Sequence, residues 1–310
     1  MMFYRRMLST MPQAILENIS TNLLLNTCIG ATIGGTCQAT LVQSLLATEC
    51  LKNETLRDAF YQVDRSIFVP EHLKKEAYKN SPLALGYNAT ISSPQHHVCV
   101  VEPLMKSIQP GQSVVDVGCG SGYLTSIFSK LVGPSGCVLG TDIIPDFVND
   151  TLENGRAVGA DNIQGYVTTS GGSLLPPEMS FDIIHIGFAL PTREMISSLT
   201  RALNPNGAMV VPLGTAGKEQ RLLLLTKKDG GEIIEVDIMS VMCQLVADEH
   251  AVEMVPVKTS SVEEITFQLQ EWKRVFENKN GKSATRCDIK NDPHANELFR
   301  QFTHVRRKQW

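Results

Sequence analysis

The sequence lacks several features that mark specialised classes of protein. Its 28 basic and 32 acidic side chains give a formal net charge of -4, so no basic excess is available to gather nucleic acid. Eight cysteines are present, but there is no C-x-x-C pair and no histidine group at zinc spacing. We therefore expect free thiols in a reduced compartment, no metal site and no nucleic-acid partner.

Long uninterrupted hydrophobic runs are also missing. Residues 18–48 carry no charge, yet polar side chains interrupt them at Asn22, Asn26, Thr27, Thr32, Thr36 and Gln38. A membrane-spanning helix needs about 20 mostly apolar residues, so we expect no membrane segment. The first residues contain Arg5 and Arg6 and no acid before Glu17, a weak transit-peptide pattern. A slightly basic end of a cytoplasmic protein is the favoured interpretation, and mitochondrial import is the alternative.

Apolar spacing predicts three helices in the first part of the chain. Their patterns are Leu41, Val42, Leu45 and Leu46; then Leu56, Phe60 and Val63 behind Asn53 as N-cap; then Val98, Val101, Leu104, Met105 and Ile108. The third helix should begin after Ser92-Ser93-Pro94, because a hydroxyl residue before proline is a typical helix start. Residues 65–94 otherwise show no regular pattern.

From Pro110 onward, short apolar runs alternate with helical patterns, which is typical of a parallel sheet with crossover helices. The predicted strands are 114–117, 138–141, 163–167, 181–186, 209–212, 222–226 and 237–243. The last two should form an antiparallel hairpin, because Gly230-Gly231 is a turn signal and no long helix separates them. We predict an α/β protein with a main domain at 34–250, an N-terminal extension at 1–33 and a C-terminal extension at 251–310.

The strongest local motif is a glycine-rich turn between a predicted strand and a predicted helix. It reads Asp116-Val117-Gly118-Cys119-Gly120-Ser121-Gly122. Such a turn brings a ligand close to backbone amides and to a helix N-terminus. The G-x-G-x-G spacing differs from the G-x-G-x-x-G of dinucleotide-binding proteins. It favours S-adenosylmethionine over NAD, although the turn could also be only a tight strand-to-helix connection.

Two acidic residues extend this motif. Asp142 ends the following strand, where it could accept hydrogen bonds from ribose hydroxyls or merely cap the next helix. Asp116 precedes the glycines, where its carboxylate could meet the ammonium of a methionine group or bond backbone amides in the turn. Both residues are therefore candidates for cofactor binding.

The sequence resembles the protein-L-isoaspartate (D-aspartate) O-methyltransferase family over roughly residues 34–248. The matching segments are Ala77-Tyr78, Ser81-Pro82, Leu85-Gly86-Tyr87, Ala89-Thr90-Ile91-Ser92, Pro94, His97, Asp116-Val117-Gly118, Gly120-Ser121-Gly122, Asp142, Ile184-His185-Ile186-Gly187 and Val211-Pro212-Leu213-Gly214. Many methyltransferases share the glycine-rich turn. The segment Ala89-Thr90-Ile91-Ser92 is nearly particular to this family.

The resemblance implies a doubly wound, Rossmann-like class I methyltransferase sheet of seven strands with one antiparallel strand. It implies methyl transfer from S-adenosyl-L-methionine, leaving S-adenosyl-L-homocysteine, to the free carboxylate of L-isoaspartyl or D-aspartyl residues in damaged proteins. Ser92 takes the place of the family's active-site serine. The implied cofactor-site residues are Ala89, Thr90, Ile91, His97, Asp116, Gly118, Gly120, Asp142, Ile143, Ser170 and Gly171.

The residue types suit this chemistry. A carboxylate is already anionic at neutral pH, so methyl transfer to it requires no strong general base. Ser92, with helix N-terminal amides beyond Pro94, could grip such a carboxylate, or its hydroxyl could simply cap the helix. Adjacent histidines on a helix point in different directions, so we assign His97 to the site and His96 to the surface. His185 lies in an apolar run and is interpreted as a satisfied core histidine.

Three positions depart from the family pattern. Ser170 stands where the family has an acid that reaches the adenine amino group, and Ala247 replaces a cofactor-binding threonine. Phe188 replaces a small residue near the acceptor, so we expect it to narrow or reshape the acceptor pocket. After them, Val262, Ile265, Leu269, Trp272 and Phe276 repeat at helical spacing behind Ser260-x-x-Glu263. We interpret this as an amphipathic helix packed on its own domain, with partner docking as the alternative.

Three functions remain open. The leading one is a repair methyltransferase that takes isoaspartyl proteins and peptides as substrates, with a monomer as its simplest assembly. The second is a non-catalytic relative that binds the nucleoside and recruits a partner protein through its tail. The third is a methyltransferase of the same fold that acts on a small molecule. Ser92 and its preceding segment favour the first.

Overall fold

The computed structural model describes residues 33–169, 174–215 and 218–243, together with Trp272, Phe276, Lys279, Asp292 and Ala295. The chain divides into two compact units, Met1–Glu249 and His250–Trp310. In the second unit, Trp272 and Phe276 are helical and their rings stack with centroids 5.2 Å apart; the other residues of the predicted tail helix lie outside the described residues. No helix in the described part of the chain is long and apolar enough to cross a membrane.

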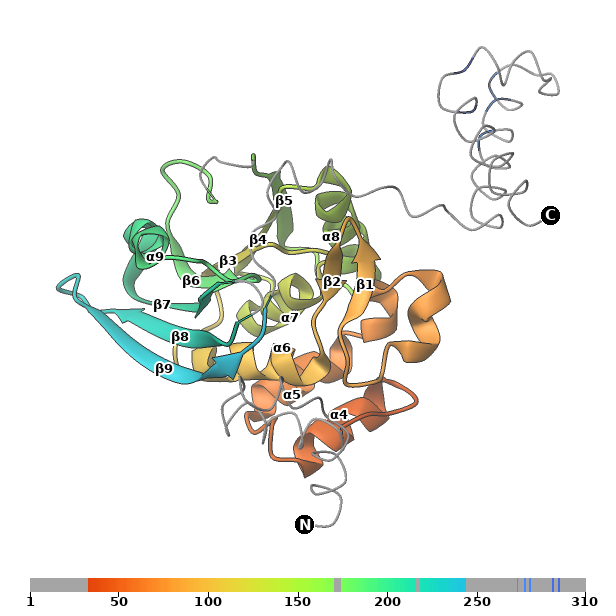
Figure 1. Cartoon of the computed structure of the whole chain (residues 1–310), viewed down its shortest axis with the longest axis horizontal. Coiled ribbons are helices and arrows are strands. Elements are labelled where there is room, and N and C mark those ends of the chain that lie inside the picture. Colours follow the sequence, from red (N-terminus) through yellow and green to blue (C-terminus); the bar gives the residue numbers. More distant parts are fainter. Residues whose placement is uncertain are drawn as a thin grey trace. The chain divides into compact units, whose positions relative to one another are not determined.

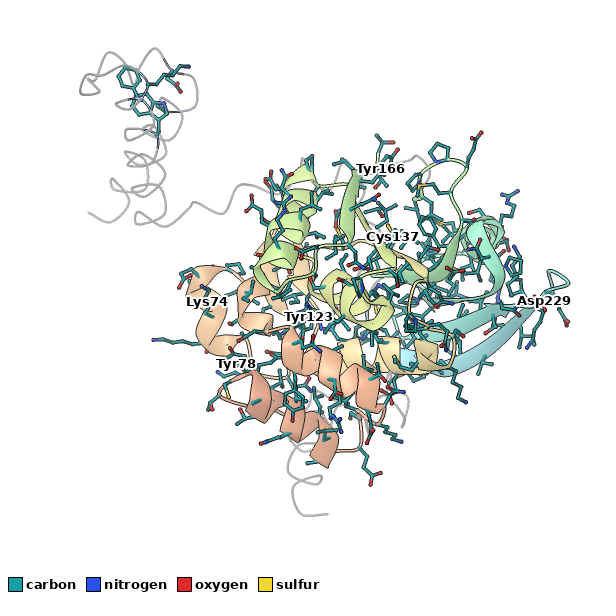
Figure 2. All side chains as sticks on the ribbon, turned by 180° about the vertical axis from the view of Figure 1, so that it is seen from behind. Lys74, Tyr78, Tyr123, Cys137, Tyr166 and Asp229 are labelled. Atoms are coloured by element: carbon teal, nitrogen blue, oxygen red, sulfur yellow. The ribbon has the colours of Figure 1, made fainter. Side chains whose placement is uncertain are left out.

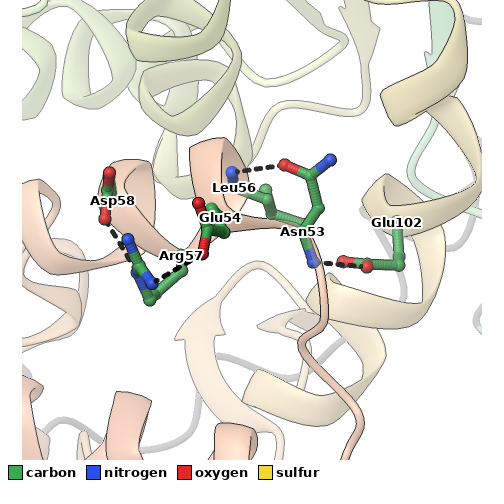
Figure 3. A network of polar contacts seen from close by, with 6 residues as sticks. All are labelled: Asn53, Glu54, Leu56, Arg57, Asp58 and Glu102. Carbon is green, nitrogen blue, oxygen red and sulfur yellow. Dashed lines mark hydrogen bonds and ion pairs between the residues drawn. The ribbon is translucent and has the colours of Figure 1, made fainter.

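Two helices open the first unit: α4 (Gln38–Ala47) and α5 (Glu54–Gln62). Asn53 is the N-cap of α5 as predicted, because its side chain accepts a 3.0 Å hydrogen bond from the Leu56 amide. Figure 3 shows this cap and, beside it, Glu102 accepting a 2.8 Å hydrogen bond from the Asn53 amide. This contact ties the start of α5 to a segment about fifty residues farther along the chain.

The segment predicted to be irregular contains four short elements. These are the 3-10 helices η1 (Arg65–Phe68) and η2 (Glu71–Glu76) and the antiparallel pair β1 (Leu83–Gly86) and β2 (Ala89–Ile91). The turn between the strands has Gly86, Tyr87 and Asn88 at positive φ. The sequence did not reveal this β1–β2 hairpin, because its strands have three and four residues and lack a clear alternation of apolar and polar side chains.

The predicted helix from Pro94 to Ile108 is shorter than expected. Helix α6 spans Pro94–Val101 and passes into the 3-10 helix η3 (Glu102–Lys106). Pro103 explains the change, because proline has no amide proton to donate to the preceding turn of an α-helix. The predicted apolar face is still correct, since Val98, Val101, Leu104 and Ile108 are buried.

The predicted seven-stranded sheet is confirmed. Its strands are β3 (Ser113–Val117), β4 (Cys137–Asp142), β5 (Ile163–Val167), β6 (Phe181–Ile186), β7 (Leu203–Leu213), β8 (Gln220–Lys227) and β9 (Ile233–Val241), in the order β5-β4-β3-β6-β7-β8-β9. Strand β8 runs antiparallel to both neighbours, and the other pairs are parallel. The β8–β9 hairpin was predicted, but β9 begins four residues earlier than expected.

Helices cover both faces of the sheet (Figure 1). On one face, α4, α5, α6 and α7 (Tyr123–Val132) share a core with Val114, Val138 and Ile183 of the sheet. Helix α8 (Pro145–Ala157) packs beside α7 on β4 and β5. On the other face, α9 (Arg193–Leu199), followed by η4 (Thr200–Ala202), shares a second core with Val115 and Ile184. The strand order reverses between β3 and β6, and ligands of such sheets bind beyond the strand ends at this reversal.

Candidate functional site

A cavity opens beyond the carboxyl ends of β3 and β6, at the point where the strand order reverses. Its lining comes from Leu85, Thr90, Ile91, Ser92, His96, His97, Asp116, Gly118, Cys119, Gly120, Ser121, Tyr123, Leu124, His185 and Gly187. The empty space, including the open mouth, is about 460 Å³. We call residues 116–124, 185 and 187 the strand-end wall, and residues 85–97 the hairpin wall.

The glycine-rich turn forms the centre of the strand-end wall. Gly118, Gly120 and Gly122 all have positive φ, at 79°, 54° and 85°, a conformation that L side chains rarely adopt. Space is also missing, because a Cβ on Gly122 would lie 2.7 Å from the Cα of Thr151. A Cβ on Gly118 would lie 2.8 Å from the ring of Phe188. Phe188 thus packs beside the turn and is not among the cavity-lining residues, contrary to the expectation that it reshapes the pocket.

Asp116 and His185 form a buried pair at the base of the cavity. They are direct neighbours in the register of β3 and β6, and His185 Nδ1 lies 2.7 Å from Asp116 Oδ1. The other carboxylate oxygen accepts a 2.6 Å hydrogen bond from the Thr125 hydroxyl. Asp116 therefore bonds side chains. The alternative interpretation, in which it bonds the backbone amides of the turn, is wrong. His185 is a satisfied buried histidine as predicted, and it also lines the cavity.

Asp142 ties the glycine-rich turn to the next loop. Its carboxylate accepts hydrogen bonds from the amides of Gly120, at 3.0 Å, and Ile144, at 3.1 Å. Burial raises the pKa of Asp142, and these amides oppose the shift because they favour the charged form. Helix α8 has no side-chain cap, so Asp142 does not serve as one. Each carboxylate oxygen retains a further lone pair that a hydroxyl could use.

The hairpin wall brings unsatisfied polar groups into the cavity. Ser93, and not Ser92, is the N-cap of α6, because the Ser93 hydroxyl accepts a 3.3 Å hydrogen bond from the His96 amide. The hydroxyls of Thr90 and Ser92 line the cavity and have no hydrogen-bond partner in the described part of the chain. The capping interpretation of Ser92 is therefore wrong, and its hydroxyl is available to a ligand.

Both histidines of α6 reach the cavity. The assignment of His96 to the surface is wrong, since it lines the cavity and its Nε2 lies 3.8 Å from the sulfur of Cys243. Burial lowers the pKa of His96 to about 4. His97 is 5% exposed and its Nδ1 lies 3.3 Å from Nη1 of Arg65. Burial, with the neighbouring Arg65, holds the pKa of His97 well below its usual value. Both imidazoles are neutral at pH 7.

The cavity brings together Thr90, Ile91, Ser92, His97, Asp116, Gly118 and Gly120 of the predicted site residues. Three further predicted residues are not part of the lining. Ala89 precedes the lining residue Thr90, Asp142 bonds the amide of the lining residue Gly120, and Ile143 follows Asp142. Ser170 and Gly171, like Ala247, lie outside the described residues. In the described residues, no three His, Cys, Asp or Glu side chains are grouped to hold a metal ion, and the six cysteines there are free thiols.

Sequence reasoning missed several lining residues. Cys119, Ser121 and Tyr123 lie within or next to the glycine motif, so proximity to it was a usable signal. His96 and Leu85 carried no such signal, because their position depends on how the hairpin and α6 fold over the strand ends.

Comparison with known proteins agrees with this geometry. The sequence model of the family described as Protein-L-isoaspartate(D-aspartate) O-methyltransferase (PCMT) matches residues 36–250. A protein-L-isoaspartate O-methyltransferase from Triticum aestivum is 35% identical over 188 residues, which are 59% of this chain and 80% of the relative. One from Methanopyrus kandleri is 34% identical over 193 residues, 62% of this chain and 83% of the relative.

Solved structures support the same fold. A protein-L-isoaspartate O-methyltransferase from Plasmodium falciparum, in complex with S-adenosyl-L-homocysteine, aligns with a TM-score of 0.60 and 24% identity, covering 69% of this chain and 100% of that one. A second structure of an enzyme of this name aligns with a TM-score of 0.59 and 18% identity, over 75% of this chain and 70% of that one. The predicted fold and the resemblance are thereby confirmed: the chain belongs to the protein-L-isoaspartate (D-aspartate) O-methyltransferase family.

Proposed function

We propose that this protein transfers a methyl group from S-adenosyl-L-methionine to the free carboxylate of L-isoaspartyl residues in damaged proteins, as a repair step. The observation that carries the proposal is the family match over residues 36–250, which spans the whole cavity with Ser92 unpartnered in it. Many relatives with this name support the same activity. D-aspartyl residues are a second candidate acceptor, since the family description includes them.

The strand-end wall fits the methyl donor. Three positive-φ glycines remove side chains where a nucleoside would approach the backbone, and Asp142 fixes Gly120 in that turn. The proposed donor contacts are Ala89, Thr90, Ile91, His97, Asp116, Gly118, Gly120, Asp142 and Ile143, together with Ser170 and Gly171. The donor supplies a sulfonium methyl group, which a carboxylate oxygen takes while the carbon–sulfur bond breaks, giving a methyl ester and S-adenosyl-L-homocysteine.

The hairpin wall fits the acceptor. The Ser92 hydroxyl has no partner among the described residues and can donate to one carboxylate oxygen while the other attacks. Since the acceptor is already anionic, the chain needs to orient it and exclude water rather than remove a proton. An isoaspartyl residue carries its main chain through the side-chain carbonyl, so its α-carboxylate is free. That carboxylate lies one methylene closer to the backbone than a normal aspartyl carboxylate, which gives the site a geometric basis for discrimination.

The test is methyl transfer from labelled S-adenosyl-L-methionine to an isoaspartyl peptide and to its normal aspartyl twin. Transfer to the first and release of methanol in base, as expected of an ester, would support the proposal. Equal labelling of both peptides would contradict the specificity. Donor binding without transfer to either peptide would favour the non-catalytic, partner-recruiting relative, and transfer to small carboxylates alone would favour a small-molecule enzyme.

Ser92→Ala gives the residue-level test. Removing one hydrogen bond to the anion should lower the transfer rate about 10–100-fold, which corresponds to roughly 1.5–3 kcal/mol. The affinity for S-adenosyl-L-homocysteine, measured by calorimetry, should not change, because the hydroxyl is assigned to the acceptor. A loss of affinity equal to the loss of rate would place Ser92 at the donor instead.

The proposal also extends beyond the site. It includes domain boundaries after residues 33 and 250, a monomeric assembly and a cytoplasmic location, with mitochondrial import as the alternative location. Fractionation of cells that express the full chain, and light scattering of the purified protein, test the last two.

A further inference from the structure

Arg65, in η1, is a buried cation that has no counter-ion in the part of the chain that the structure describes. Its side chain is fully buried, and no carboxylate of the described residues lies within ion-pair distance of it. The neighbouring Asp64 is already bonded to the Tyr78 hydroxyl and to the Ser66 amide. Burial lowers the pKa of Arg65 to about 10, so the guanidinium remains charged at neutral pH. Burying an unpaired charge is costly, so its retention here requires a reason.

The guanidinium lies directly behind two residues that line the cavity. Nη1 is 3.3 Å from His97 Nδ1, and Nη2 donates to the Ser81 carbonyl at 3.4 Å. The central guanidinium carbon lies 5.5 Å from the ring centroid of Tyr123, a distance at which cation–π attraction acts. Figure 2 labels Tyr123 in the interior of the unit. The ring of His97 is 5.0 Å from the same Tyr123 ring, so the three side chains form one cluster.

This geometry determines which ring nitrogen of His97 carries the proton. An arginine side chain donates hydrogen bonds and does not accept them, so Nδ1 of His97 must present its lone pair to Arg65. The neutral imidazole then carries its proton on Nε2. A second proton on Nδ1 would break the bond and place two positive charges 3.3 Å apart. His97 Nε2 has no partner among the described residues, and His97 lines the cavity, so an N–H donor is available to a ligand there.

We propose that Arg65 is a positioning residue that fixes His97 as a neutral Nε2–H donor and lends buried positive charge to the binding of a carboxylate in the cavity. The inference rests on the proposed function, which offers two carboxylates: that of the methionine part of the donor and that of the acceptor. Asp116, His185 and His96 also face this region. The Asp116 carboxylate is already held by His185 and Thr125, which leaves Arg65 as the uncompensated charge.

Arg65→Met removes the charge and keeps an unbranched side chain; Arg57→Met is its matched control. Arg57 bonds Asp58 on α5 (Figure 3) and does not line the cavity. Calorimetry with S-adenosyl-L-homocysteine and with 5′-methylthioadenosine, which lacks the amino-acid part, separates the two sources. If the donor carboxylate is recognised, Arg65→Met loses roughly 10–100-fold in affinity for the first ligand and little for the second.

If the acceptor carboxylate is recognised, both affinities hold and KM for the isoaspartyl peptide rises by a similar factor. The control should change none of these values. Unchanged affinities and an unchanged KM in Arg65→Met would overturn the role in carboxylate binding.

Two further measurements distinguish this positioning role of Arg65 from a purely structural one. Imidazole ¹⁵N chemical shifts should report an unprotonated Nδ1 and a protonated Nε2 for His97 in the wild type and in Arg65→Lys. In Arg65→Met both nitrogens should move toward the average of two exchanging tautomers. Arg65→Met should lower the ligand affinity less in a His97→Ala background than in the wild type, because Arg65 acts through His97.

These readouts keep two failures apart. The ¹⁵N measurement needs no ligand, so an Nδ1–H tautomer in the wild type would reject the inference whatever the activity. Absence of donor binding by the wild type would instead reject the proposed function. If Arg65→Met does not fold, Arg65→Lys must retain the tautomer and the affinity to within about three-fold, and a larger loss counts against the inference.

Discussion

The two walls of the cavity differ in how firmly they are held in the fold. In the strand-end wall, Asp116 is bonded to His185 and Thr125, and the glycine turn fits tightly against Thr151 and Phe188. In the hairpin wall, Thr90 and Ser92 have no hydrogen-bond partner among the described residues.

The hairpin wall also rests on a weaker support. Its residues 85–91 belong to a two-stranded sheet, which on its own is marginally stable. The hairpin turn is attached to α8 through Tyr87, whose hydroxyl bonds Asp146 and whose ring contacts Phe147 at 5.5 Å. The carboxylate and the glycine turn of the strand-end wall are therefore held in place, although the hydroxyls of Ser121 and Tyr123 have no partner among the described residues. The hairpin wall has free hydroxyls on a less firmly held backbone. Binding of a nucleoside can rely on the first, and choice of acceptor on the second.

The largest difference between the walls should appear when the same substitution is made in each. Gly122→Ala combines a positive φ with a 2.7 Å approach to the Thr151 backbone, so the free energy of unfolding should fall by about 3 kcal/mol or more. Gly86→Ala has a φ of 98° but no atom within 4 Å, and should cost about 1–2 kcal/mol. Urea unfolding measures both. Equal losses would show that the strand-end wall is not the more tightly packed.

Acid should destabilise the protein through the hairpin wall. The pKa of His96 falls from 6.5 to about 4 on folding, so between these values the unfolded state binds the proton first and stability is lost as the pH falls. At 1.36 kcal/mol per pKa unit, the shift of His96 lowers the free energy of unfolding by at most roughly 3 kcal/mol by pH 4.

Unfolding curves at pH 7, 5.5 and 4.5 test this expectation. His96→Gln should reduce the pH dependence and leave the part that the buried His97 contributes. His72→Gln, on the exposed surface of η2, should leave the pH dependence as in the wild type. An equal slope in all three proteins would remove His96 as its source.

Asp142→Ala should act on the strand-end wall alone. Loss of the carboxylate frees the Gly120 and Ile144 amides and removes any bonds to the ribose, so affinity for S-adenosyl-L-homocysteine should fall by roughly 1.5–3 kcal/mol. Asp161→Ala, an exposed residue before β5, is the control. If calorimetry finds the same affinity for both variants, Asp142 has a structural role and no contact with the ligand.

The smallest expected effect separates two adjacent serines. Ser93→Ala removes the N-cap of α6 and should cost about 1 kcal/mol of stability. Ser92→Ala should change stability by less than about 0.5 kcal/mol, because its hydroxyl has no partner to lose within the described residues. Thermal unfolding of the two variants decides the matter. A larger loss for Ser92→Ala would return the capping role to Ser92.

The sequence by itself determined the parts of this protein that local patterns encode. Alternating apolar runs and helical spacing located the seven strands, and Asn53 and the Ser93-Pro94 pair located two helix starts, because strands, caps and turns depend on residues a few positions apart. The Gly118 to Gly122 turn and the segment Ala89 to Ser92 were enough to indicate a cofactor site and a family.

Only the tertiary structure decided which of these groups are free and which are satisfied. His185 meets Asp116 across 69 residues, and Arg65 meets His97 across 32. His96 and His97 are adjacent on α6 and both line the cavity, which depends on how α6 packs in the core. Hydrogen bonds and burial between distant segments depend on the packing of the whole core, and no local pattern specifies that packing. For this reason the sequence located the site, while the fold assigned its polar groups to scaffold or to ligand.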